Sequence, residues 1–394
     1  MMKSCVIGVA IAALLSILPA AAEPLRVKFG VLRQPHSSET LSILDLPAED
    51  DTLAGALIGV ADDNTTGRFT GQSYEAVDEK LASGEDAVAT AQKLVNDGAI
   101  AILVDLPAAD LLRVADALKS RDTLLFNVSA TDDSLREEDC RANVLHVAPT
   151  RSMLTDGLAQ YLVWKQWRRW LLVKGSHPED ELLAKAFRAS AKKFGAKIVD
   201  ERIYVDTEGG RRSDSGSVQT QRLIPPLTQG ASYDVLIAAD ESDVFANYLP
   251  YRSFDPRPVA GSAGLAPTSW DASHEQWGAV QLQNRFRKQF HRGMNARDHQ
   301  AWIAARMIGE AATRASSADP KTLAAYLTGP DFTIAAFKGV RLSLRPWNRQ
   351  LRQPILLGDG RMIVSVSPQE GFLHQTSELD TLGVDKPETK CRLQ

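Results

Sequence analysis

Short apolar runs of β type alternate with amphipathic helical patterns along most of the chain. In the first third of the chain, strands are predicted at 26–32, 73–78, 99–104 and 123–127, and helices at 48–63, 85–96 and 108–119. Parallel strands need long crossover connections, which are usually helices, so this alternation is typical of βαβ units. The sequence therefore predicts an α/β fold with parallel sheets that helices cover on both faces.

A second alternating series follows, and the order of elements then changes. Its strands are predicted at 170–174, 197–205, 233–238 and 258–260, with helices at 151–167, 179–194, 219–227 and 243–251. Two long helices come next, and 337–366 is expected to form antiparallel strands. We interpret this order as two doubly wound, Rossmann-like lobes joined by three crossing segments. The expected division is 23–147 plus 277–336 for lobe 1, 148–276 plus 337–375 for lobe 2, and 376–394 for a C-terminal tail.

The first 22 residues have the three parts of a signal peptide. Lys3 is the positive end, 5–18 is an apolar core, and Ala20-Ala21-Ala22 is a small-residue cleavage site. The apolar core is shorter than the stretch of about 20 residues that crosses a bilayer. We expect export to the periplasm with cleavage near Ala22; a retained signal anchor is the alternative.

Two cysteines, Cys140 and Cys391, remain after such a cleavage. Disulfides form and persist in oxidising compartments such as the periplasm. A disulfide between these two residues is therefore predicted, and it would tie the C-terminal tail to lobe 1. The alternative is two unpaired thiols.

Composition and motifs argue against several classes of function. The formal net charge of −4 is opposite in sign to a broadly basic surface, so no nucleic-acid partner is expected. The sequence lacks the nucleophile elbow, the phosphate-binding loop and the zinc-binding His-Glu-x-x-His motif. Its seven histidines are scattered, which favours structural or solvated roles over a metal site. These features predict a binding protein, not an enzyme.

Two segments carry a resemblance to a known family. The segment AGALIGVADDNTTGRFTGQSYE at 54–75 resembles the helix-to-strand passage of type 1 periplasmic solute-binding proteins of the leucine/isoleucine/valine-binding family. The segment FNVSATDDSLR at 126–136 is similar to the part of that family in which a Ser-Ala-Thr stretch borders the ligand. The resemblance implies a Venus flytrap fold and a monomer that binds a small molecule without a required cofactor. It also implies an inner-membrane ABC permease and its ATPase as partners.

A narrower resemblance concerns the ligand. The segments SILDLPAEDDTLAGA, QYLVWKQWRRWLLVKGS and GFLHQTSELDTLG are similar to the substrate-binding component of ABC systems associated with alcohol catabolism that depends on pyrroloquinoline quinone (PQQ). This resemblance implies PQQ, a flat tricarboxylate, as a possible transported ligand. A small carboxylic acid or an amino acid is the alternative ligand, and a sensor without transport is the alternative role.

Ligands of open α/β sheets bind beyond the carboxyl ends of the strands, near helix N-termini. The residues expected there in lobe 1 are Arg33, Gln34, Asp105, Leu106, Pro107, Ser129, Ala130 and Thr131, with Arg68 in a nearby turn. In lobe 2 they are Lys174, Ser176, His177, Asp240 and Glu241, and near the third crossing they are Trp270 and Trp277.

Each of these groups has two interpretations. Ser129 and Thr131 could hold a carboxylate or cap a helix, and Glu241 could hold an ammonium group or cap a helix. The cationic side chains could bind the carboxylates of PQQ, although Arg68 is also an ordinary solvated turn residue. The two tryptophans could stack on a flat ligand or pack in the hinge.

Overall fold

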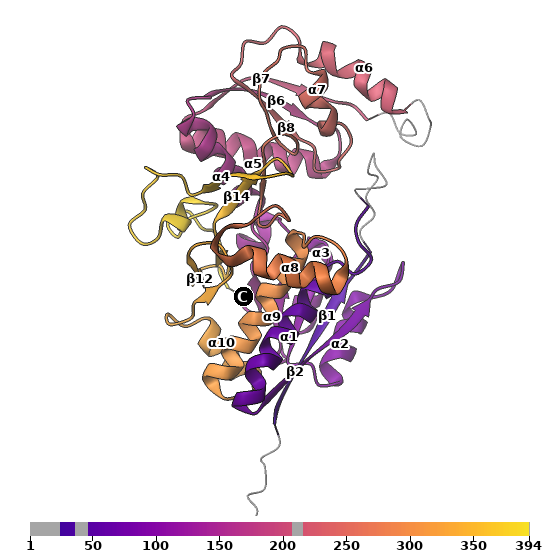
Figure 1. Cartoon of the computed structure of the whole chain (residues 1–394), viewed down its shortest axis with the longest axis vertical. Helices are drawn as coiled ribbons and strands as arrows, with labels where there is room; N and C mark the ends of the chain where they lie inside the picture. The colour runs from indigo at the N-terminus through magenta and orange to yellow at the C-terminus, as the bar shows by residue number, and fades with distance from the viewer. Residues whose placement is uncertain (1–23, 36–45, 207–215, 394) are drawn as a thin grey trace, which may run out of the picture.

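The computed structural model describes residues 24–35, 46–206 and 216–393. It has two lobes stacked along the long axis of the molecule (Figure 1). The predicted signal peptide lies outside the described residues, as does most of the glycine-rich stretch after residue 206. In the described ranges, no helix combines the length and apolar character needed to cross a membrane.

Lobe 1 is built on a parallel sheet with the strand order β2-β1-β3-β4-β5. The strands are β1 (Leu25–Arg33), β2 (Gln72–Lys80), β3 (Ala101–Asp105), β4 (Leu124–Asn127) and β5 (Val144–His146). Its helices are α1 (Leu53–Thr70), α2 (Ala87–Asn96), α3 (Ala108–Ala117), α8 (Ala279–Phe290), α9 (Ala296–Ala315) and α10 (Pro320–Leu327).

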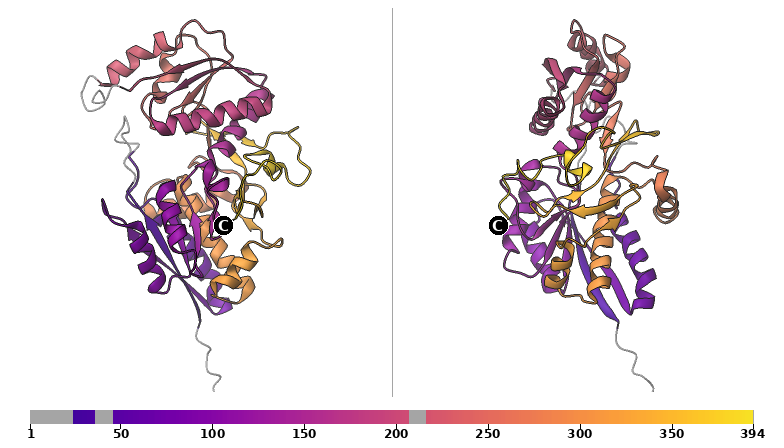
Figure 2. Two further views of the ribbon diagram at one scale, coloured as in Figure 1. Left: turned by 180° about the vertical axis from the view of Figure 1, so that it is seen from behind. Right: turned by 90° about the vertical axis from the view of Figure 1, so that its left-hand side faces the viewer.

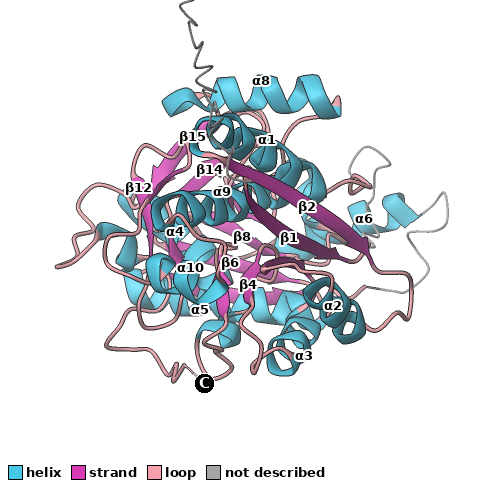
Figure 3. Ribbon diagram, turned by 90° about the horizontal axis from the view of Figure 1, so that it is seen from below, coloured by secondary structure: helices cyan, strands magenta, loops and turns pink. Residues whose placement is uncertain are grey.

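The two faces of this sheet have separate cores. Helices α1 and α9 pack on one face with Phe29 and Phe126, and α2 and α3 pack on the other with Leu32 and Ile102 (Figure 3). Strands with near-continuous apolar residues predict a parallel sheet that is covered on both faces, as this one is. The sequence prediction of the fold class is confirmed here.

Lobe 2 repeats the plan with the strand order β7-β6-β8-β9, again parallel. The strands are β6 (Arg169–Lys174), β7 (Lys197–Ile203), β8 (Val235–Ala239) and β9 (Val259–Gly261). Its helices are α4 (Arg151–Trp164), α5 (Pro178–Phe194), α6 (Gly216–Thr228) and the short α7 (Leu249–Arg252). The expected helix at 243–251 is replaced by a 3-10 turn, η3 (Ala246–Tyr248), and α7.

Two small antiparallel sheets flank the junction of the lobes. The first has the order β10 (Ala266–Thr268), β14 (Ile355–Gly358) and β15 (Ile363–Ser367), and it contacts α4 of lobe 2. The second has the order β11 (Ile334–Ala335), β12 (Arg341–Leu344) and β13 (Leu351–Arg352).

The second small sheet belongs to lobe 1. Leu342, Leu344 and Leu351 pack in the same core as Phe29. The chain therefore enters lobe 2 for the last time at β14, later than the boundary expected at residue 337. Apolar side chains at alternate positions of β12 decide this, because they are buried against α9 and its neighbours.

The C-terminal tail contacts both lobes. The disulfide between Cys140 and Cys391 ties it to lobe 1, as predicted from the sequence. In lobe 2, Asp156 of α4 accepts a hydrogen bond from the backbone N–H of Gly383 at 2.8 Å. The yellow tail accordingly lies beside the junction of the lobes in both views of Figure 2.

Candidate functional site

The loop after β4 is folded back over the end of its own strand. Asn127, fully buried, accepts hydrogen bonds from the backbone N–H groups of Ser129 and Ala130 at 3.2 and 2.9 Å. Its amide also donates to the Ala130 carbonyl at 2.8 Å. An asparagine side chain that bonds its own backbone in this way fixes a tight turn. The hydroxyl groups of Ser129 and Thr131 have no hydrogen-bond partner among the described residues.

Arg151, the first residue of α4, connects this loop to lobe 2. Its backbone N–H donates to the Thr131 carbonyl at 2.9 Å. Its guanidinium donates to both carboxylate oxygens of Glu241, at 2.6 and 2.7 Å, and lies 3.1 Å from Asp132. We call Ser129, Ala130, Thr131, Asp132, Arg151 and Glu241 the interlobe site.

The charges of the interlobe site are unequal. One guanidinium faces two carboxylates, so the three groups together carry one net negative charge when all are ionised. Burial alone would lower the pKa of Arg151, but the contacts with Glu241 and Asp132 raise it above its ordinary value. Burial raises the pKa of Glu241, and Arg151 opposes that shift.

The other residues predicted in lobe 1 have structural partners. Arg33 forms a bidentate ion pair with Asp78, at 2.7 and 2.8 Å, and also donates to the Glu49 carbonyl. The Asp105 carboxylate accepts from the Thr52 hydroxyl at 2.6 Å, and its carbonyl accepts from Gln34 N–H. Leu106 is buried, and Pro107 directly precedes α3.

Arg68 lies away from these residues. It is exposed in the last turn of α1, just before the amino end of β2. The interlobe site lies beyond the carboxyl ends of the same parallel strands, at the other end of the sheet. The sequence prediction placed it in a turn because Gly67 precedes it, but α1 continues through this glycine to Thr70. Gly67 is needed for close packing, since an added Cβ would lie 2.4 Å from the Gln72 carbonyl oxygen.

The residues predicted in lobe 2 also have partners. Lys174 pairs with Glu181 and lies 3.9 Å from Glu201. The Ser176 hydroxyl accepts from Asp206 N–H at 3.1 Å, and His177 contacts the Asp206 carboxylate at 3.1 Å, which raises the His177 pKa.

Asp240 has a capping role. Its buried carboxylate accepts from the backbone N–H groups of Val244, Phe245 and Ala246, at 2.9, 2.7 and 2.6 Å. These bonds satisfy the donors that a helical turn leaves unpaired at its start. Asp240 therefore stabilises the turn that leads into η3.

The two predicted tryptophans differ. Trp270 is 2 % exposed, stacks on His299 with ring centroids 3.8 Å apart, and meets His274 edge-on. Its ring is thus packed in the core cluster of lobe 1, against α9. Trp277 is 47 % exposed, so its indole has a free surface.

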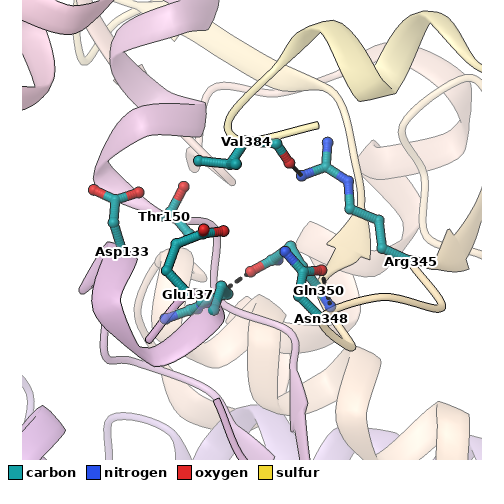
Figure 4. Close-up of a pocket in the computed structure, with 8 residues that line it drawn as sticks. Asp133, Glu137, Thr150, Arg345, Asn348, Gln350 and Val384 are labelled. Atoms are coloured by element: carbon teal, nitrogen blue, oxygen red, sulfur yellow. Dashed lines mark hydrogen bonds between the residues drawn. The ribbon is translucent and has the colours of Figure 1, made fainter. Parts of the chain in front are cut away.

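Sequence reasoning missed Arg136 and Arg151. Arg136 is 1 % exposed in the turn η2 (Asp133–Arg136) and contacts the loop of the interlobe site. A small crevice, partly open to solvent, lies beside it, and side chains from the turn η2, the tail and the segment before β13 are among those that line it (Figure 4). The one available signal for Arg151 was its place directly after Thr150, a residue that caps helices and does so here.

Comparisons with known proteins agree with this architecture. A family model described as "Periplasmic binding protein" matches residues 47–215. A search of curated proteins found no match.

Solved structures match over nearly the whole chain. The leucine-, isoleucine-, valine-, threonine- and alanine-binding protein of Brucella ovis, in a closed conformation, is similar with a TM-score of 0.69 and 14 % identity, covering 95 % of this chain and 100 % of that one. A periplasmic ligand-binding protein of a branched-chain amino acid ABC transporter from Burkholderia xenovorans has a TM-score of 0.68 and 18 % identity, covering 86 % and 95 %.

A third example, from Streptococcus pneumoniae, is a branched-chain amino acid transporter substrate-binding protein in complex with isoleucine. Its TM-score is 0.62 at 16 % identity, and the match covers 87 % of this chain and 99 % of that one. Identities this low establish the fold. The chain has the two-lobed α/β fold of the periplasmic binding proteins.

Proposed function

We propose that this protein is the solute-binding component of an ABC importer, and that its two lobes close on a small solute that carries a carboxylate. The observation that supports it most directly is the 2.9 Å hydrogen bond from Arg151 N–H to the Thr131 carbonyl. This contact and the Arg151–Glu241 ion pair connect the loop that carries the Ser129 and Thr131 hydroxyl groups to an oriented carboxylate from lobe 2. A ligand between them would touch both lobes.

Such two-sided contacts give a mechanism. A ligand shifts a conformational equilibrium only by the difference in its affinity for the two states. The closed state offers contacts to Ser129, Thr131 and Glu241 together, whereas the open state offers fewer of them, so the ligand favours closure about the hinge. The closed form then docks on an inner-membrane permease, and the associated ATPase drives opening and release.

The charges favour an amino acid over PQQ as the solute. Glu241 has both oxygens oriented by Arg151, and each oxygen keeps a lone pair for an ammonium group. A tricarboxylate such as PQQ would instead meet a site with net negative charge. The cations expected for it, Arg33, Lys174 and His177, are already engaged by carboxylates.

PQQ stays the second candidate because of one observation. Trp277 leaves a half-exposed indole face, on which a flat aromatic ligand could stack. The resemblance of several segments to the PQQ-associated subgroup points the same way.

Calorimetric titration of the mature protein tests the proposal. The panel contains aliphatic amino acids, short-chain carboxylic acids and PQQ. We expect one-to-one binding of an amino acid and weaker binding by T131V, with the exposed α1 variant T66V as the matched control. Binding of PQQ alone would favour the second candidate, and no binding by any carboxylate would contradict the proposal. Uptake of the bound solute in cells that lack the permease would contradict the transport role.

A further inference from the structure

Arg136 is a buried cation whose contacts are all neutral. Its guanidinium donates to the carbonyls of Ala148, Ala130 and Asp132, at 2.7, 2.9 and 3.0 Å, and to the Gln350 side-chain oxygen at 2.8 Å. Among the described residues, no carboxylate oxygen accepts a hydrogen bond from it. Most buried charges in proteins are paired, so this arrangement is unusual.

The arrangement costs stability. Burial lowers the pKa of Arg136 to about 9, which still leaves the group charged at neutral pH. A buried charge without an ionic partner loses its hydration and gains no ion pair in return. A neutral side chain that made the same hydrogen bonds would stabilise the fold more. We therefore expect the charge of Arg136 to serve a purpose other than stability.

The surrounding charges indicate that role. The loop after β4 is flanked by the carboxylates of Asp132, Asp133 and Glu241, and Arg151 contacts only the first and the third of these. Without Arg136, one guanidinium would face three carboxylates, and a ligand anion at Ser129 and Thr131 would be repelled. Arg136 contacts Ala130, the residue between those two hydroxyl groups.

We propose that Arg136 is a positioning residue of the interlobe site: it holds the backbone of Ala130 and Asp132 in place and supplies the positive charge that lets the Ser129 and Thr131 hydroxyl groups donate hydrogen bonds to a carboxylate. This inference rests on the proposed function for the identity of the bound group. The inference adds to the site a residue that contacts the backbone of the loop and is not expected to touch the ligand.

The link to Gln350 ties this residue to the hinge. The Gln350 amide donates to the carbonyls of His146, the last residue of β5, and of Ala148, which lies between β5 and α4 where the chain first passes into lobe 2. Gln350 itself directly precedes β13, the last strand of lobe 1 before the chain enters lobe 2 at β14. Arg136 therefore joins the loop of the interlobe site to two of the segments that must rotate when the lobes close.

A thiol at position 131 can report the local potential without any ligand. The probe is T131C in the mature protein, which lacks Cys5 and in which Cys140 and Cys391 are bonded to each other, so iodoacetamide reports on the introduced thiol. The pH dependence of its alkylation by iodoacetamide gives the thiol pKa, which falls near positive charge. The variants R136K, which keeps the charge, and R136Q, which removes it, are compared with this parent.

We expect R136Q to raise the thiol pKa by about half a unit and to slow alkylation near pH 7 about three-fold, while R136K stays close to the parent. The matched control is R202Q, since Arg202 also donates to backbone carbonyls, at Leu227 and Gln229, but in lobe 2. Equal thiol pKa values in the parent and R136Q would overturn the proposal. Equal changes in R136K and R136Q would reduce Arg136 to a structural role and would also overturn it.

Folding of each variant is checked by circular dichroism. If R136Q does not fold, R136M replaces it as the uncharged variant. Failure of both to fold, with R136K folded, would show that the charge serves the fold and would overturn the proposal. Because the probe needs no ligand, a titration in which no carboxylate binds would contradict the proposed function and leave the thiol result standing.

Discussion

Glu241 and Arg151 form a bidentate ion pair at 2.6 and 2.7 Å. Glu241 follows the carboxyl end of β8 and Arg151 begins α4, so the pair lies where lobe 2 meets the loop after β4 of lobe 1. Because both carboxylate oxygens of Glu241 accept from Arg151, the ion pair fixes the orientation of the acidic group of the interlobe site. Groups held in their bound geometry lose less entropy on binding, which increases affinity.

The variant E241Q tests the role of this carboxylate. We expect the affinity for an amino acid that binds the parent to fall about 10- to 100-fold, because a charge-assisted hydrogen bond contributes about 1.5–3 kcal/mol. The affinity for the corresponding acid without its amino group should change little. Titration calorimetry measures both. E310Q, in an exposed pair on α9, is the control, and an equal loss for both ligands would contradict the role.

The disulfide between Cys140 and Cys391 closes a loop of 251 residues. We expect the double variant C140S/C391S to be less stable by about 2–5 kcal/mol, since removing a native disulfide allows the unfolded chain more freedom. The tail should also become sensitive to protease near Lys390, whose backbone bond to Glu137 depends on the nearby link. Thermal unfolding and limited proteolysis measure these two effects. An unchanged cleavage pattern would show that the contacts of Asp156 and Lys193 with Gly383 are sufficient to keep the tail in place without the disulfide.

Close packing of α1 against α9 predicts a large effect at Gly55. A Cβ atom added there would lie 1.8 Å from the Asp298 carbonyl oxygen, which no side-chain rotation can relieve. We expect G55A to destabilise the protein by about 3 kcal/mol or more, because overpacking forces the backbone to move. Urea unfolding measures the change. A61S, on the exposed side of the same helix, should differ little from the parent, and a similar value for G55A would mean that α9 can shift freely.

The sequence predicted the elements well because their signals are local. Alternating apolar runs and helical periods identified the strands of both parallel sheets except the three-residue β5, and compartment chemistry identified the Cys140–Cys391 pair. An apolar strand such as β3 is recognisable from five consecutive residues, all of them buried here.

The candidate site was harder to predict because partner choice is not local. Arg33 was expected to meet a ligand, but its partner Asp78 comes from β2, 45 residues away. Trp270 was expected near the cleft, and its ring is covered by His299 from α9. Arg136 contacts Gln350 across 214 residues. Spacing along the chain places each residue at a strand end but does not reveal which neighbour neutralises it.

Lys338 provides a last test, because it is a buried cation at the hinge. It is 1 % exposed, and its amine donates to the Gln353 side-chain oxygen at 2.6 Å and to the Pro354 carbonyl at 3.2 Å. Gln353 in turn donates to the Val147 carbonyl of the first crossing at 2.7 Å. Burial lowers the pKa of Lys338 to about 7.

The sign of the pH effect follows from this pKa. In the unfolded chain the lysine titrates near pH 10.4, so between about pH 7 and 10 the unfolded state binds a proton that the folded state has released. Stability then increases with pH in this window, by up to about 1.4 kcal/mol per pH unit. Burial raises the pKa of Asp63 to about 7, so this carboxyl group changes the stability at pH values below 7. Its effect therefore lies outside the window in which Lys338 acts.

Urea unfolding at several values between pH 7 and 9 measures the increase. The variant K338M lacks the titrating group, so the difference in stability between the parent and K338M should move in favour of the parent as the pH rises. K321M, which removes an exposed lysine paired with Asp122, should follow the parent. Parallel curves for the parent and K338M would mean that Lys338 keeps its charge in the hinge, and the two crossings would then be joined by an ionised amine.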